Sequence, residues 1–194
     1  MKIYVKGAIG TGATTLAAFD NALVKTGTAN YNLVRLSSVI PPKAEIIELD
    51  GDMPQLPGEW GDRLYAVYAE MRTQIHNEEA WAGIGWVVEP DTGRGLFVEH
   101  EGMSEQKVRR DITDSLKGLL HNRGMAELPI QMHVVGAKCE GESICAFVVA
   151  AYQVSDWNNQ VVSSRVPLGE KLGMSWKNRR KTEENAPDNP NIES

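Results

Sequence analysis

Two adjacent serines, Ser37 and Ser38, stand at the end of a stretch with strand patterning and shortly before a Pro-Pro pair at 41–42. Apolar and polar side chains alternate over residues 31–36, as in a half-buried strand. Proline has no N–H to donate to a strand ladder, so pairing must break near the serines and leave them at the strand exit. From local pattern alone, the simplest interpretation is a polar strand end that enters a loop.

An adjacent serine pair also permits a reaction of the backbone itself. The hydroxyl of Ser38 can attack the carbonyl carbon of Ser37, which converts the peptide bond into an ester. An amide is otherwise very stable, so this step needs a constrained backbone. β-Elimination from the ester leaves dehydroalanine, and hydrolysis of dehydroalanine gives a pyruvoyl group and ammonia.

Carboxylates are the other candidate chemical groups. Alternation over residues 96–101 places Glu99 and Glu101 on one face of a predicted strand and His100 on the other. Asp20 lies at the edge of the apolar stripe of a predicted helix, and its spacing alone indicates an ordinary solvated carboxylate.

Other residue types predict no further catalytic motif. The four histidines lack metal-ligand spacing, so we expect no metal site, and no serine lies in a Gly-x-Ser-x-Gly elbow. The glycine-rich segment 7–12 fits neither the dinucleotide-binding pattern nor the P-loop, and we predict a flexible loop there. Cys139 and Cys145 are expected to be reduced thiols of a cytoplasmic protein.

Length and composition predict one globular protein. The 194 residues are 42% hydrophobic and 24% charged, which is ordinary for a globular chain. A net charge of −6 argues against general nucleic-acid binding. No apolar run approaches the roughly 20 residues that span a bilayer, so we expect no membrane partner. The N-terminal apolar run is too short for a signal peptide, which favours a cytoplasmic location.

The elements that must position these residues follow from periodicity. Helices are predicted at about 13–26, where Leu16, Phe19, Leu23 and Val24 fall at helical spacing, and between an N-cap at Ser104 and a stop at Gly124. Strands are predicted at 2–6, 31–38, 44–49, 63–75, 80–88, 96–101, 130–137 and 143–154.

The order of these elements predicts the architecture. Strand, helix, strand, strand occurs in the first 50 residues and again from about 95 to 154. We expect each unit to form a sheet covered by one helix, and the two sheets to pack as a four-layer αββα sandwich of the α/β (α+β) class. Residues 1–154 would be one domain, and 155–194 an extension whose last part is disordered.

Four segments carry a family resemblance: Leu16-Ala-Ala-Phe-Asp-Asn-Ala-Leu23, Asn32-Leu-Val-Arg-Leu-Ser-Ser-Val-Ile-Pro-Pro-Lys-Ala-Glu45, Phe97-Val-Glu-His-Glu-Gly102 and Cys145-Ala-Phe-Val-Val-Ala-Ala151. In this order they resemble the processing region, the later acidic strand and the closing apolar strand of the pyruvoyl-dependent arginine decarboxylases. The resemblance covers about residues 1–154, and the combination is more specific than any single motif.

The resemblance implies self-processing. The bond between Ser37 and Ser38 would be cleaved to give chains of residues 1–37 and 38–194. Ser38 would become a covalent pyruvoyl group, the only cofactor, and Asn32 would assist the cleavage.

It also implies a reaction, in which arginine yields agmatine and CO₂ through a Schiff base with the pyruvoyl ketone. The ketone serves as an electron sink of the kind that cofactors supply. Glu99 would return a proton to the carbanion, and Asp20 would pair with the substrate guanidinium. Family members are trimers of the αββα fold with sites between subunits, so a small-molecule substrate and a homotrimer are expected.

Three departures from the family leave alternatives open. Ala29 and Tyr31 stand where the family carries Gly and Val near the substrate, and His100 stands where it carries Tyr. The same chemistry on another amino acid, such as histidine, is therefore a second hypothesis. A third is an unprocessed trimeric protein that keeps the fold and binds a ligand.

Overall fold

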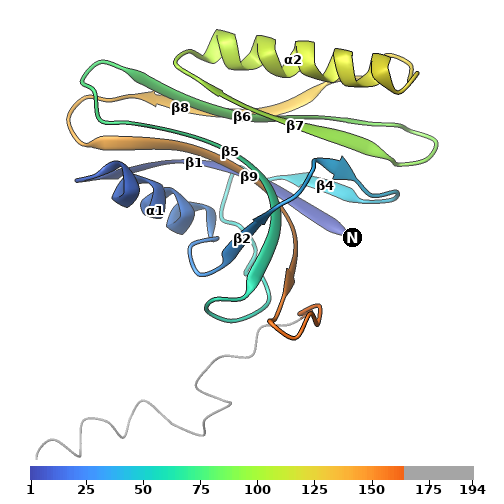
Figure 1. Cartoon of the computed structure of the whole chain (residues 1–194), viewed down its shortest axis with the longest axis horizontal. Helices are drawn as coiled ribbons and strands as arrows, with labels where there is room; N and C mark the ends of the chain where they lie inside the picture. Colours follow the sequence, from blue (N-terminus) through green and yellow to red (C-terminus); the bar gives the residue numbers. More distant parts are fainter. Residues whose placement is uncertain (164–194) are drawn as a thin grey trace, which may run out of the picture.

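A computed structural model describes residues 1–163, and Figure 1 shows how its elements are arranged. The elements are β1 (Lys2–Gly12), α1 (Thr15–Thr26), β2 (Asn32–Arg35), β3 (Val39–Ile40), β4 (Glu45–Glu48), β5 (Arg63–Thr73), β6 (Glu79–Val88), β7 (Gly95–Gly102), α2 (Glu105–Asn122), β8 (Gln131–Lys138) and β9 (Ser143–Ser155). The disorder predicted for the last part of 155–194 lies outside the described residues.

Two sheets and two helices form four layers. A five-stranded sheet has the order β2-β5-β9-β1-β4, and a four-stranded sheet has the order β3-β7-β6-β8. Helix α1 covers the outer face of the first sheet and α2 the outer face of the second (Figure 1). The predicted αββα sandwich is confirmed.

Apolar side chains fill each of the three spaces between these layers. Ile3, Val67, Ile84 and Phe97 lie between the two sheets, Phe147 lies under α1, and α2 buries Val108, Ile112, Leu116 and Leu120. Neither helix within residues 1–163 combines the length and the apolar character that a membrane crossing requires.

The two sheets draw strands from both repeated units. The predicted order strand-helix-strand-strand is present as β1-α1-β2-β4, with the unpredicted short strand β3 between β2 and β4, and as β7-α2-β8-β9. We expected each unit to build its own sheet, but β9 pairs with β1 and β5, and β3 pairs with β7. The reason lies in the composition of β9, because a strand that is apolar on both faces is most stable in the middle of a covered sheet.

The predicted flexible loop at 7–12 is wrong, because β1 continues through it to Gly12. These glycines permit close packing. A Cβ on Gly10 would overlap the backbone of α1 at Ala18 and Ala22. Glycine lets the helix approach the strand closely, so here it marks helix–strand contact and not a turn.

Gly10→Ala should therefore lower the free energy of unfolding by about 1–3 kcal/mol, the usual cost of forcing extra volume into a packed contact. Gly51→Ala is the matched control, because a Cβ there meets nothing within 4 Å. Urea unfolding of both variants checks this, and equal midpoints for Gly10→Ala and wild type would contradict it.

The same close approach changes which face of α1 is buried. Ala18, Ala22 and Thr26 are the buried residues, because only small side chains fit against β1. Phe19 and Leu23 pack at the side of this contact, whereas Leu16 and Val24 are 66% and 57% exposed. The apolar stripe predicted for this helix is thus only partly buried.

Candidate active site

The chain crosses from one sheet to the other at the two serines. β2 pairs in parallel with β5 in the five-stranded sheet, and β3 pairs with the first residues of β7 in the four-stranded sheet. Residues 36–38 connect the two strands, so the predicted strand exit is confirmed. Because the segment is bound to a sheet on each side, its backbone has little freedom.

Ser38 has a left-handed backbone with φ of 68°. This conformation is uncommon for residues other than glycine and costs of order 1–3 kcal/mol. Two hydrogen bonds hold it. The backbone N–H of Phe97 donates to the Ser38 carbonyl oxygen at 2.8 Å, and Ser38 Oγ donates to Glu99 Oε2 at 2.8 Å. The constrained backbone that the chemistry requires is present at this serine.

Glu99 reaches Ser38 because of the alternation along β7. Phe97 belongs to the core between the sheets and Val98 to the core under α2, so Glu99 lies on the side of Phe97. His100 lies on the other face, where its Nε2 is 2.8 Å from Ser115 Oγ of α2. The predicted separation of Glu99 from His100 is confirmed.

A cavity of about 420 Å³ lies beside Ser38, within the range of small-molecule sites. Residues of β7 and α2 form its wall. β3 pairs only with Gly95 and Leu96, so the edge of β7 that follows is not covered by a strand. The residues that line the cavity are Ser38, Phe97, Val98, Glu99, His100, Ser115, Gly118, Leu119 and Asn122.

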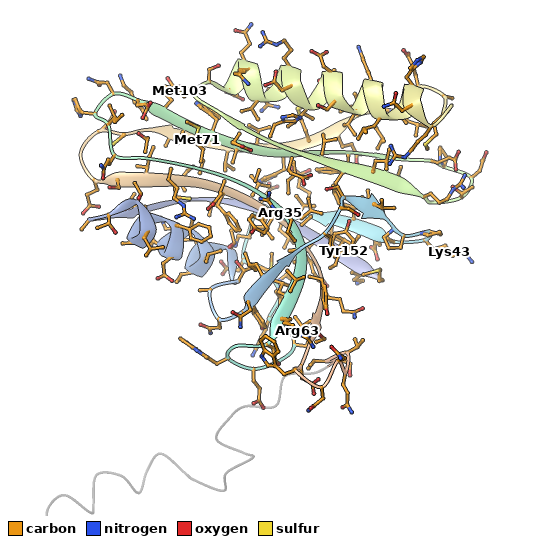
Figure 2. All side chains as sticks on the ribbon, viewed as in Figure 1. Arg35, Lys43, Arg63, Met71, Met103 and Tyr152 are labelled. Carbon is orange, nitrogen blue, oxygen red and sulfur yellow. The ribbon has the colours of Figure 1, made fainter. Side chains whose placement is uncertain are left out.

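Two predicted site residues lie elsewhere in the chain. Asn32 stands at the other end of β2 from the serines and pairs with Arg63 of β5, the residue labelled in Figure 2. Its Nδ2 donates to the Gly61 carbonyl at 2.6 Å. Asp20 is exposed on α1, and neither it nor Asn32 lines the cavity. A single chain therefore brings together Ser38 and Glu99 but neither of the other two.

Two of the three departures from the family also have defined positions. Tyr31 is buried, and its hydroxyl donates to the carbonyls of Leu56 and Pro57. Tyr31 therefore supports the loop after β4 within this chain. His100, in contrast, lines the cavity beside Ser38.

Known proteins resemble this chain over most of its length. Residues 2–164 match the family model described as pyruvoyl-dependent arginine decarboxylase (PvlArgDC). The chain belongs to this family. A pyruvoyl-dependent arginine decarboxylase of Methanocaldococcus jannaschii is 33% identical over 142 residues, which cover 72% of this chain and 82% of the relative. One from Halobacterium salinarum is 34% identical over 158 residues, 80% of this chain and 96% of the relative.

Membership of a pyruvoyl-dependent family implies a covalent pyruvoyl group, and position 38 fits one. The hydroxyl that the group would lose faces the Glu99 carboxylate, and the carbonyl that it would keep has a backbone donor from Phe97. Position 38 also opens onto a cavity large enough for a substrate.

Sequence reasoning missed Tyr152. Its hydroxyl donates to the Val39 carbonyl at 3.2 Å, and its ring lies 6.0 Å from that of Phe97. Burial raises the pKa of Tyr152, and the negative charge of Glu99 raises it further. The one available signal was a hydroxyl-bearing residue directly after the apolar run of β9.

Proposed function

We propose that the chain is a self-processing decarboxylase that forms its pyruvoyl group from Ser38 and converts arginine to agmatine and CO₂. The observation that carries the proposal is the strained backbone of Ser38 with its hydroxyl on the Glu99 carboxylate. Membership of the pyruvoyl-dependent arginine decarboxylase family supports the reaction and the substrate.

The first step of processing transfers the Ser37 acyl group from nitrogen to oxygen. Ser38 Oγ attacks the carbonyl carbon of Ser37, the new C–O bond forms, and the C–N bond breaks. The hydroxyl proton passes to Glu99, which already accepts its hydrogen bond, and from there to the departing amine nitrogen. Release of the left-handed strain at Ser38 favours this step.

The next steps separate the chains. Loss of the Cα proton of residue 38 breaks its Cβ–O bond, so Ser37 leaves with a free carboxylate and residue 38 becomes dehydroalanine. Water then replaces the nitrogen of residue 38, which departs as ammonia. The products are chains of residues 1–37 and 38–194, the second blocked by a pyruvoyl group.

In decarboxylation, the pyruvoyl ketone supplies an electrophilic carbon for the substrate amine and an electron sink for the pair left by CO₂. Glu99, on the cavity wall beside residue 38, delivers a proton to the substrate Cα. Asp20 pairs with the guanidinium, a geometry that a carboxylate matches with two hydrogen bonds. The apolar side chains of Phe97, Val98 and Leu119 form part of the cavity lining.

We infer that the active protein is a cytoplasmic homotrimer with sites between subunits. Asp20 is exposed and does not line the cavity of its own chain, and in such a trimer Asp20 of the partner subunit would supply the guanidinium contact. Asn32, which we propose assists processing, is likewise remote from the serines of its own chain. The two buried cysteines are free, in keeping with a reducing compartment.

The intact mass of the purified protein, combined with a CO₂-release assay across amino acids, tests the proposal. We expect two chains divided between Ser37 and Ser38, a carbonyl at the start of the second, and CO₂ from arginine. Release of CO₂ from histidine instead of arginine would support the second hypothesis, the same chemistry on another amino acid. A full-length mass with no reactive carbonyl would exclude the enzyme and leave a ligand-binding protein.

Asp20→Asn should lower kcat/KM for arginine by about 10- to 100-fold, the range expected when one charged hydrogen bond is lost, while self-cleavage continues. Asp114→Asn is a matched control, since Asp114 is an exposed helix carboxylate that does not line the cavity. Unchanged arginine kinetics in Asp20→Asn would show that Asp20 does not bind the substrate guanidinium.

A further inference from the structure

Tyr152 interrupts the pairing of β9. Along β5, Tyr65 pairs with Gln153 and the next residue, Ala66, pairs with Ala151, so Tyr152 has no partner on β5. Its neighbour Ala151 is also the last residue of β9 that pairs with β1. Tyr152 is thus the extra residue of a β-bulge, a device that redirects side chains and is frequent beside active sites.

The Tyr152 side chain reaches from the five-stranded sheet to the first residue of β3. Its ring packs edge-on against Phe97, at an interplanar angle of 66°, in the core between the sheets. Its hydroxyl donates to the carbonyl of Val39, the residue that follows Ser38. This is the only hydrogen bond of the Tyr152 hydroxyl among the described residues.

Tyr152 and Phe97 together fix the chain directly after the bond that is to break. The Phe97 N–H holds the carbonyl of Ser38, and the Tyr152 hydroxyl holds the carbonyl of Val39. With two consecutive carbonyls held, residue 38 cannot rotate out of its left-handed conformation without the loss of a hydrogen bond. That conformation directs its hydroxyl to Glu99.

We infer that Tyr152 is a positioning residue for self-cleavage, which holds the Val39 peptide so that Ser38 stays in the strained conformation from which its hydroxyl attacks. The inference rests on the proposed self-processing and adds a residue to it. Because burial and the Glu99 charge raise the pKa of Tyr152, its hydroxyl keeps its proton and remains a donor near neutral pH.

The test is the rate at which freshly made full-length protein separates into two chains. Tyr152→Phe keeps the ring contact with Phe97 and loses only the hydroxyl, and we expect cleavage to slow by about three- to tenfold, the effect of one hydrogen bond. Tyr65→Phe is the matched control, because its hydroxyl also has a single hydrogen-bond partner among the described residues, the Ser155 hydroxyl, but lies outside the site. It should cleave at the wild-type rate, and the two variants, each of which loses one hydrogen bond, should have similar melting temperatures.

Hydroxylamine separates positioning from later steps, because it cleaves an ester and leaves the amide intact. If Tyr152 acts on the attack, hydroxylamine should not restore the rate of Tyr152→Phe. Restoration would show that the ester forms normally and would overturn the inference. The inference would also be overturned if Tyr152→Phe were cleaved at the same rate as wild type. A wild type that never cleaves would instead refute the proposed function, and the inference with it.

Discussion

The variant Ser38→Ala should remain a single chain of 21.4 kDa and release no CO₂ from arginine. Alanine has no hydroxyl to attack the preceding carbonyl and cannot become a pyruvoyl group, so cleavage and decarboxylation are lost together. A denaturing gel, an intact mass and a CO₂ assay on the same preparation measure the effect, which should be complete. The fold should persist, because Ser38 is half-buried and its side chain bonds only to Glu99 among the described residues.

Ser37→Ala is the control for this result. Ser37 contributes its main-chain carbonyl, and its side chain is exposed, so alanine at 37 should still be cleaved. If Ser38→Ala were cleaved at the same bond, the hydroxyl of Ser38 would not be the nucleophile. If Ser37→Ala alone blocked cleavage, Ser37 would be the nucleophile, and the bond that breaks would be the one between Leu36 and Ser37.

Local pattern predicted the strand exit at the serines but not their surroundings. Alternation placed Ser37 and Ser38 at the end of a strand, and the same rule placed Glu99 and His100 on opposite faces of β7. Both predictions depend only on the pattern of residues that are adjacent in the sequence. The contact between Ser38 and Glu99 joins residues 61 apart, and it exists because the chain changes sheets between β2 and β3. Only the resemblance to the family brought these two residues together before the fold was known.

The misinterpreted elements share a physical cause. Gly10 was predicted to lie in a loop because glycine is frequent in turns, yet here it accommodates a helix that packs closely on a strand. Leu16 and Val24 looked buried because they are large and apolar, yet the close contact admits only small side chains. Tyr152 escaped notice because a β-bulge depends on how three strands register, and the sequence of one strand does not contain that information.

Glu99→Gln should impair two reactions that occur at different times. Glutamine has nearly the same shape, and its amide oxygen can still accept the hydrogen bond of Ser38 Oγ, so the precursor geometry is preserved. It cannot take up the hydroxyl proton, and self-cleavage should therefore slow. In the fraction that is cleaved, it cannot return a proton to the substrate Cα, and kcat should fall by about 10²- to 10⁴-fold, the usual contribution of a general acid.

The two effects can be measured separately, because cleavage is followed on a gel and turnover can be expressed per mole of reactive carbonyl. Glu101→Gln is the matched control: it lies two residues along β7 on the same face, is exposed, and does not line the cavity. Normal cleavage with lost turnover in Glu99→Gln would confine Glu99 to decarboxylation and require another base for Ser38. Normal turnover per mole of reactive carbonyl in Glu99→Gln would show that Glu99 is not the proton donor in decarboxylation. Loss of both would mean that one carboxylate serves first the chain's own peptide bond and then the substrate, because both reactions occur at residue 38.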